Sequence, residues 1–271
     1  MTQKTVKDLM HRGLITCQPD ASLGQIAKLL TQHHVHALIV AESNDNPLGI
    51  ISDFDLLAGE WLSVDKDSLN AMRKMTAREL MTAPIQSMEA DTSVEDAARI
   101  LSEKQVHRML VTELGAPVGV ISVSDIVASI AKQEKVSREK VGDVMSNAFL
   151  VCRDKTPVIS AARTMTQAGW RSVIVVDSRG KALGIVTGSY LLRIAGKSVD
   201  ENLTVSEVMN RRLLTIDMNA SLQEAANMMI QNHRHRVIVI DTNDPESLPL
   251  GIISSVDIVA QMAKPGSIWQ G

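Results

Sequence analysis

Four stretches of the chain share one arrangement of hydrophobic and polar positions. In the first stretch, Leu23, Ile26, Ala27 and Leu30 follow the 0, 3, 4, 7 spacing that places side chains on one face of a helix. Three further sets keep the same phase: Val94, Ala97, Ala98 and Leu101; Val158, Ala161, Ala162 and Met165; Leu222, Ala225, Ala226 and Met229. The pattern predicts four amphipathic helices at equivalent places of an internal repeat.

The residues around these helices complete the repeat. Ser22, Ser93 and Ser221 precede three of the helices as N-caps, and Pro157 stands in the first turn of the remaining one. Runs rich in β-branched residues follow at 38–40, 109–111, 173–175 and 237–239, and they are typical of buried strands. After a polar turn come GIISDFDLL (49–57), GVISVSDIV (119–127), GIVTGSYLL (184–192) and GIISSVDIV (251–259). Each repeat is therefore predicted to run strand, helix, strand, strand, helix.

A short phrase ending in methionine opens every repeat. DLM, ELM, DVM and EVM end at Met10, Met81, Met145 and Met209, and the next 26 positions align without a gap. A three-stranded sheet of this size cannot bury both of its faces alone, so the repeats are expected to pack on one another.

Composition excludes several classes of protein. The net charge is −3 with 22% charged residues of both signs, which argues against binding to nucleic acid or to an anionic membrane. Only 2% of residues are aromatic, which disfavours a base-stacking surface. No apolar run approaches the length of a membrane span, and the first residues lack the apolar core of a signal peptide, so a cytoplasmic location is expected.

Metal and catalytic sites are not expected. Cys17 and Cys152 form no metal-binding spacing, and the histidines near 33–36 and 233–235 lack the helical spacing of a zinc motif. The sequence contains no P-loop and no nucleophile elbow. We therefore expect a protein that is not an enzyme and that requires no cofactor.

The opening helix that ends in methionine, the capped helix, the phrases VHRMLV and RHRVIVI, and the pattern G-[IV]-[IV]-S-x-x-D-[IL] together resemble the cystathionine-β-synthase (CBS) domain. The resemblance extends from about Val6 to Ala263 in four copies. It implies an α/β (α+β) fold of four β-α-β-β-α repeats, at about 5–60, 75–132, 141–196 and 203–263. The repeats would pair into two tandem modules, 1–135 and 136–271, with their junction within 133–140.

Such modules stack into a disc, within one chain or between two chains, and hold adenosine-containing ligands in the clefts between paired repeats. A carboxylate in the first turn of the last helix would bind vicinal ribose hydroxyls, which assigns this role to Asp55, Asp125 and Asp257. An acidic residue there also favours the helix dipole without any ligand. At the preceding strand end, Ser52, Ser122 and Ser254 are expected to bind phosphate, at the opposite end of the ligand from the aspartate.

Cations that could balance a phosphate occupy one position, 26 residues after each opening methionine: His36, His107, Arg171 and His235. Arg108 and Arg236 follow directly in two repeats. The resemblance of VHRMLV to the adenylate-sensing subunit of AMP-activated protein kinase implies that His107-Arg108 and His235-Arg236 contact phosphate. Arg171 is expected to serve a neighbouring cleft. Thr16, Ser87 and Thr215, six residues after their methionines, would line the adenine and ribose region.

The third repeat departs from the others at two polar positions, because Val151 replaces a hydroxyl and Tyr190 replaces the aspartate. We expect between one and three occupied sites. The leading hypothesis is a regulatory sensor of AMP, ADP, ATP, S-adenosylmethionine or NAD that acts on a separate partner protein, as a homodimer or as an intrachain disc. The alternative is an interaction or assembly scaffold whose pockets are vestigial.

Overall fold

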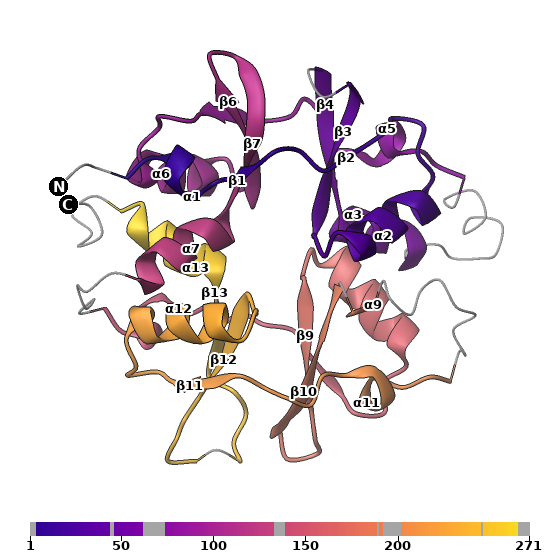
Figure 1. The fold of residues 1–271 in the computed structure, drawn as a ribbon. Coiled ribbons are helices and arrows are strands. Elements are labelled where there is room, and N and C mark those ends of the chain that lie inside the picture. Colours follow the sequence, from indigo (N-terminus) through magenta and orange to yellow (C-terminus); the bar gives the residue numbers. More distant parts are fainter. Residues whose placement is uncertain are drawn as a thin grey trace.

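Four small sheets, each with helices on one side, make up the protein (Figure 1). The computed structural model describes residues 4–43, 46–61, 74–132, 139–188, 190–191, 202–244 and 246–264. The first repeat contains β2 (Thr16–Cys17), α2 (Leu23–Gln32), β3 (Ala37–Ser43), β4 (Asn46–Ser52) and α3 (Asp53–Trp61). The predicted order of strand, helix, strand, strand, helix is therefore confirmed for this repeat.

The second and fourth repeats follow the same plan, and so does the third up to its last helix, most of which lies outside the described residues. The second contains β5 (Ser87–Glu89), α6 (Val94–Glu103), β6 (Arg108–Glu113), β7 (Ala116–Ser122) and α7 (Val123–Ala131). The third contains β8 (Val151–Arg153), α9 (Val158–Gln167), β9 (Ser172–Val176) and β10 (Ala182–Thr187). The fourth contains β11 (Thr215–Asp217), α12 (Leu222–Gln231), β12 (Arg236–Ile240), β13 (Gly251–Ser254) and α13 (Ser255–Met262). In each sheet the first strand is parallel to the second and the second is antiparallel to the third.

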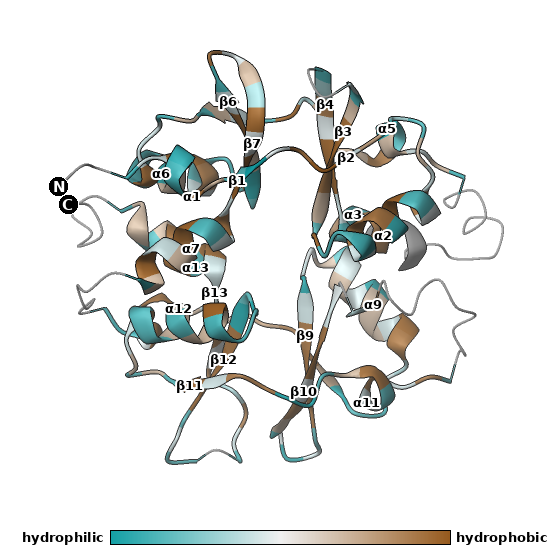
Figure 2. Cartoon of the chain, viewed as in Figure 1, coloured by the Kyte–Doolittle hydropathy of each residue, from teal (hydrophilic) through white to brown (hydrophobic). Residues whose placement is uncertain are grey.

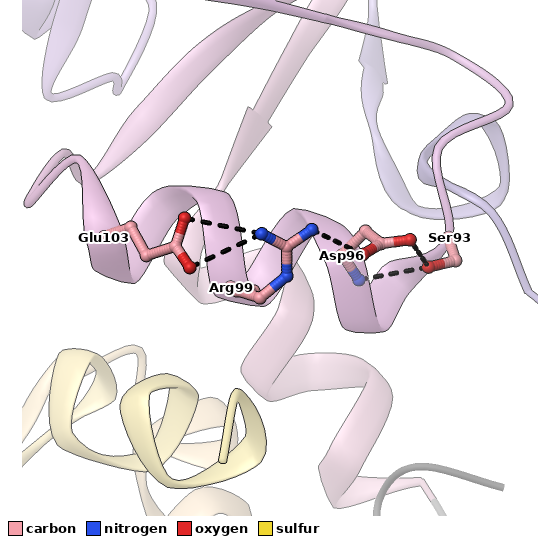
Figure 3. Close-up of polar contacts among 4 residues, drawn as sticks. All are labelled: Ser93, Asp96, Arg99 and Glu103. Carbon is pink, nitrogen blue, oxygen red and sulfur yellow. Dashed lines mark hydrogen bonds and ion pairs between the residues drawn. The ribbon is translucent and has the colours of Figure 1, made fainter. Parts of the chain in front are cut away.

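The long helix of each repeat begins where the sequence predicts. The side chains of Ser22, Ser93 and Ser221 accept hydrogen bonds from backbone N–H groups three residues ahead, as N-caps do. On α6, Asp96 and Glu103 also bind Arg99 along the exposed face (Figure 3). The prediction for Pro157 was wrong by one position, because it is the N-cap of α9 and keeps an extended ψ of 138° instead of entering the first turn.

The apolar face of each long helix packs onto its sheet. Ala97, Ala98 and Leu101 of α6 are buried, and so are their equivalents in the other repeats except Ala27, which is partly exposed. The predicted strands at 38–40, 109–111, 173–175 and 237–239 are buried along their whole length. Figure 2 shows this partition, with hydrophobic colour on the strands and hydrophilic colour on the outer turns of α6 and α12.

The opening helices are exchanged between neighbouring repeats. The helix α1 (Val6–Leu9) opens the first repeat in sequence, yet Thr5 bridges to Ser93 and the following strand β1 (His11–Arg12) pairs with β7 of the second repeat. Conversely α5 (Ala77–Leu80) lies beside the first repeat, where Thr76 bridges to Ser22. Figure 1 shows α1 next to α6, and α5 on the side of α2.

The third and fourth repeats exchange their openings in the same way. The helix α8 (Val141–Val144) follows Lys140, which bridges to Ser221 of the fourth repeat. The helix α11 (Val205–Val208) follows Thr204, which bridges to Pro157 of the third. Each methionine phrase therefore opens one repeat in sequence and completes its neighbour in space.

This exchange explains why methionine and glycine both recur. A Cβ atom added to Gly49 would lie 2.6 Å from Sδ of Met81, and one added to Gly184 would lie 2.5 Å from Sδ of Met209. At Gly119 and Gly251 the closest atom is instead the carbonyl oxygen of the residue that follows the opening methionine. Only glycine allows the opening segment to approach the strand this closely.

The four repeats surround a common centre within one chain. Ile39 and Leu110 pack the first sheet against the second, and Ile174 and Ile238 pack the third against the fourth. Helices of the second and fourth repeats share one hydrophobic cluster, and Leu57 of α3 belongs to the cluster of the third repeat. A disc of four repeats is thus formed without a second chain (Figure 1).

Most of the predicted junction between the two modules, residues 133–138, lies outside the described residues, as do residues 62–73 between the first and second repeats. Among the residues that the structure does describe, no helix has the length and apolar character of a membrane span.

Candidate functional site

The three aspartates assigned to ribose lie in the first turn of their helices. In each, Oδ2 accepts hydrogen bonds from the backbone N–H and the hydroxyl of the serine three residues earlier. The N–H to Oδ2 distances are 2.7 Å for Asp55, 2.8 Å for Asp125 and 2.7 Å for Asp257. The structural role as a helix cap is therefore present in all three.

This geometry corrects one expectation about the serines. The hydroxyls of Ser52, Ser122 and Ser254 lie 2.7, 2.6 and 2.6 Å from the aspartate carboxylates. A serine in contact with the aspartate cannot bind phosphate at the opposite end of a ligand whose ribose the same aspartate binds. If a ligand placed its ribose at the aspartate, its phosphate would have to contact other residues.

The second carboxylate oxygen differs among the repeats. Oδ1 of Asp125 lies 3.0 Å from Nε2 of His11. Within the described part of the chain, no hydrogen bond or ion pair reaches Oδ1 of Asp55 or Asp257. Two aspartates therefore present a free oxygen at the start of the helix, and Asp125 does not.

The third repeat has lost this arrangement. Gly188 takes the position after the strand, and a Cβ added there would lie 3.1 Å from Cδ2 of Leu57. Helix α3 of the first repeat therefore packs beside the residues that follow β10. The partly buried ring of Tyr190 packs against the hydrophobic cluster that includes Leu57.

The cationic positions of all four repeats come together. The rings of His36 and His235 lie 5.5 Å apart, edge to face. The guanidinium of Arg171 covers the ring of Phe54, and Nδ1 of His235 lies 3.1 Å from the hydroxyl of Ser124. We call His36, His107, Arg108, Arg171, His235 and Arg236 the central cluster.

Two histidines of the central cluster, His107 and His235, are kept neutral. Loss of surrounding water lowers the pKa of His107 to about 4, and the charges of Arg171 and Arg108 act in the same direction. The pKa of His235 is also lowered to about 4, first by loss of water and then by His36 and Arg236. These two rings therefore add no positive charge at neutral pH, in contrast to the arginines beside them.

These arginines have carboxylates nearby but none within ion-pair distance. Burial lowers the pKa of Arg108, and burial followed by the charge of Arg171 lowers that of Arg236 to about 10, while Asp53 acts on both in the opposite direction. Across the described ranges, no ion pair joins Arg108, Arg171 or Arg236 to a carboxylate. Buried cations that carboxylates reach only from a distance are incompletely compensated, so this cluster is suited to an anion.

The hydroxyl residues expected near adenine lie at sheet edges. Thr16, Ser87 and Thr215 begin β2, β5 and β11, the edge strands, and Val151 begins β8. No hydrogen bond between described residues connects these positions to the central cluster. The structure thus brings the histidines and arginines together, and the role of the edge hydroxyls stays a prediction.

Sequence reasoning missed four residues near the site. Asp53 binds Nδ1 of His36 at 2.9 Å, and His11, Phe54 and Ser124 make the contacts described above. Asp53, Phe54 and Ser124 lie within the quoted strand-helix motif, but their residue types vary among repeats. His11 directly follows Met10, and its role depends on the exchange of opening segments.

A separate hollow beside α5 is less suited to a charged ligand. Its volume is about 350 Å³, and it is lined by Gln18, Pro19, Asp20, Glu42, Thr76 and Arg78. The one arginine in this lining is already paired, with Arg78 Nη2 at 3.0 Å from Glu42 Oε1. We therefore place the candidate site at the central cluster.

Metal and thiol chemistry find little support in the geometry. No three histidine, cysteine or acidic side chains in the described ranges are grouped so as to hold a metal ion. Burial raises the pKa of both Cys17 and Cys152 to about 11, which keeps these thiols protonated.

Comparison with known proteins places this geometry in context. The family model described as the CBS domain matches residues 6–60, 77–132, 141–197 and 205–264. Protein MJ1404 of Methanocaldococcus jannaschii is 28% identical over 201 residues, which cover 73% of this chain and 46% of that protein. The chain thus spans about half the length of this relative.

Two solved structures share the fold. The crystal structure of MJ1225 from Methanocaldococcus jannaschii, described as a proposed archaeal homologue of g-AMPK, has a TM-score of 0.83 at 19% identity and covers 94% of this chain and 99% of its own. A protein from Pyrococcus horikoshii has a TM-score of 0.67 at 22% identity and covers 96% of this chain and 100% of its own. These TM-scores show that the two proteins share the fold of this chain, and at such low identities they show no more than the fold.

Proposed function

The chain belongs to the CBS domain family, whose model matches four repeats along almost its whole length, and from this premise we propose that it is a regulatory protein that binds adenosine-containing ligands between paired repeats. The ligands that fit are AMP, ADP, ATP or a related adenosyl compound. The protein would act on a separate partner and would catalyse no reaction itself.

The unpaired arginines of the central cluster are the observation that carries this proposal. Arg108, Arg171 and Arg236 come from three repeats, and the charge of Arg171 reaches both of the others. A phosphate group forms charge-assisted, bidentate hydrogen bonds with guanidinium groups. The phosphate of a ligand would thus lie beside these guanidinium groups, where no carboxylate of the described residues forms an ion pair.

The aspartates support a ribose next to that phosphate. Asp55 and Asp257 each keep one oxygen free while the other caps the helix. Vicinal hydroxyls can donate to such an oxygen, as ribose does to acidic residues in dinucleotide-binding folds. The third repeat offers no such acid, so we assign its Arg171 to a ligand held by the neighbouring repeats.

Ligand binding would regulate the protein by changing how the four repeats of the disc pack on one another. The cluster takes residues from all four repeats, so a ligand that draws the arginines together changes how the repeats pack. The ligand shifts the equilibrium between two arrangements only by its difference in affinity for them. MJ1225, which shares the fold, is described as related to g-AMPK, which agrees with a nucleotide-sensing role.

Thermal unfolding with a panel of ligands tests the proposal. The panel contains AMP, ADP, ATP, S-adenosylmethionine and NAD, with guanosine nucleotides as controls. A ligand at about 100 times its Kd stabilises the folded state by about 2.7 kcal/mol, which raises the Tm by several degrees in a protein of this size. A response selective for adenosine compounds is expected.

Matched arginine variants connect the response to the cluster. Arg108→Gln and Arg236→Gln should reduce the shift produced by AMP, whereas Arg99→Gln, which removes an exposed and paired arginine on α6, should leave it unchanged. A flat response of the intact protein to the whole panel would reject the proposal and favour the scaffold alternative.

A further inference from the structure

His11 lies beside the acidic residue of a repeat that is not its own. It is in β1, where it pairs with Val120 of β7, and Met10 before it packs near Gly119. The exchange of opening segments thus brings an imidazole to the start of α7. Its side chain is 81% exposed, so it can move aside without disturbing the core.

The contact occupies the one oxygen of Asp125 that the helix cap leaves free. Nε2 of His11 lies 3.0 Å from Oδ1, while Oδ2 accepts from the N–H and hydroxyl of Ser122. The carboxylate side chain is only 13% exposed. A ribose hydroxyl that approaches Oδ1 must share this oxygen with the imidazole or displace it.

The equivalent positions of the other repeats hold no titratable group. Thr82, Ser146 and Asn210 follow their methionines and form the corresponding backbone bridges, to Ile50, Ile252 and Ile185. The hydroxyl of Ser146 donates to the carbonyl of Ala148 and not to Asp257. The imidazole is therefore a feature of the site at Asp125 alone.

We propose that His11 is a pH-dependent gate that sets the affinity of the Asp125 site for the ribose of an adenosine ligand. This inference rests on the proposed function. A protonated imidazole donates a charge-assisted hydrogen bond to the carboxylate, stronger than the bond that a neutral ring donates, so it competes better with the ribose hydroxyls. Histidine is the side chain that most readily gains or loses a proton near neutral pH. The proposal therefore predicts that the site at Asp125 fills more readily as the pH rises.

Other charged groups around Asp125 do not provide this switch. The guanidinium of Arg108 on β6 acts on Asp125 but keeps its charge throughout the range. Ser122, the N-cap of α7, and Ser124 in its first turn carry hydroxyl groups that do not ionise in this pH range. His235, which contacts Ser124, and His107 stay neutral above about pH 4 because their pKa values are lowered to about 4.

The experiment isolates the Asp125 site in the full-length chain. The parent is the double variant Asp55→Asn and Asp257→Asn, in which asparagine keeps the helix caps but removes the other carboxylates. Its affinity for AMP is measured by calorimetry at pH 5.5 and pH 8, alone and with His11→Ala, His11→Gln or Thr82→Ala added. Ionisation of AMP itself affects all variants equally and cancels in the comparison.

Removal of the imidazole should strengthen binding in acid. We expect His11→Ala to raise the affinity at pH 5.5 by about fivefold relative to the parent, with little change at pH 8, since a charged hydrogen bond is lost only in acid. His11→Gln, a neutral donor, should give the same affinity ratio between the two pH values as His11→Ala. Thr82→Ala lies at the equivalent place beside the first repeat and should change nothing.

Three outcomes would overturn the gate. An unchanged affinity ratio in His11→Ala would show that the imidazole does not compete, while the proposed function would stand. Weaker binding by His11→Ala at both pH values would make His11 a ligand contact. Absence of AMP binding by the wild-type chain and by every variant would reject the proposed function and the gate together.

Discussion

The guanidinium carbon of Arg171 lies 4.8 Å from the centroid of the Phe54 ring. The contact joins the third repeat to the first. Arg171 belongs to the third repeat, in which Tyr190 replaces the aspartate. At the place of Phe54, the second and fourth repeats have Ser124 and Val256. The aromatic ring thus fixes the direction in which Arg171 enters the central cluster.

Replacement of Phe54 should weaken recognition of phosphate. A cation–π contact contributes about 0.5–2 kcal/mol, so Phe54→Leu should lower the affinity for AMP by roughly twofold to thirtyfold. The affinity for adenosine, which lacks the phosphate, should stay the same. Calorimetry with both ligands measures the difference, and Val256→Ala at the equivalent exposed position is the control. An equal loss for both ligands would contradict a role through Arg171.

Alanine at the repeated glycine should be destabilising. The Cβ of Gly119→Ala would collide with the carbonyl oxygen of His11, which belongs to backbone and cannot turn aside. The expected loss is about 1–3 kcal/mol of unfolding free energy, measured with urea. Gly24→Ala in α2 is the opposite control, since nothing lies within 4 Å and alanine favours the helix by about 0.5–1 kcal/mol. Equal effects at the two sites would refute the close approach of the opening segment.

Stability should fall in acid because of His107. Its pKa is lowered to about 4 in the folded protein from the ordinary value of 6.5, so the unfolded chain binds a proton that the folded one refuses. The stabilisation is complete above pH 6.5 and is lost as the pH falls toward 4, by about 3 kcal/mol, since each pKa unit corresponds to about 1.4 kcal/mol. Urea unfolding of His107→Gln at pH 7.5 and 4.5 should show a smaller decrease than the wild type. His33→Gln, at an exposed position, should lose as much unfolding free energy between these pH values as the wild type. An equal loss in all three proteins would disprove the assignment to His107.

Substitutions at Asp257 should separate its two roles. Asparagine can keep the cap on the N–H of Ser254, whereas alanine cannot, so Asp257→Ala should lose about 1 kcal/mol of stability that Asp257→Asn retains. Both variants should bind AMP more weakly, by about tenfold, because neither offers a carboxylate to ribose. The 2′-deoxy analogue of AMP, which lacks the hydroxyl that would bind the carboxylate, should bind the variants and the wild type with similar affinity. Undiminished AMP binding in both variants would leave Asp257 with the structural role alone.

Local patterns in the sequence were sufficient to predict the elements of each repeat. The caps at Ser22, Ser93 and Ser221 were predictable because the capping hydrogen bond spans only three residues. The strands at 173–175 and 237–239 were predictable because a continuous apolar run is typical of a buried strand. The bond from Ser122 to Asp125 has the same short range, and the S-x-x-D spacing was a capping signal that the ribose interpretation did not use.

Contacts between distant segments could not be predicted in this way. Met81 reaches Gly49, and His11 reaches Asp125, because opening segments cross to the neighbouring repeat, which an alignment of repeats cannot show. The gathering of His36, Arg171 and His235 was only partly foreseen. Their common position in the repeat was evident, but their meeting depends on four repeats closing around one centre.

The crossed opening segments also bear on how such a chain could arise. A gene fragment encoding one repeat, from its methionine phrase to its last helix, would carry an opening segment that fits a different repeat and would leave its own glycine strand uncovered. Two fragments in tandem would satisfy each other. Duplication would therefore yield a folded product in steps of two repeats, and four repeats correspond to two such pairs.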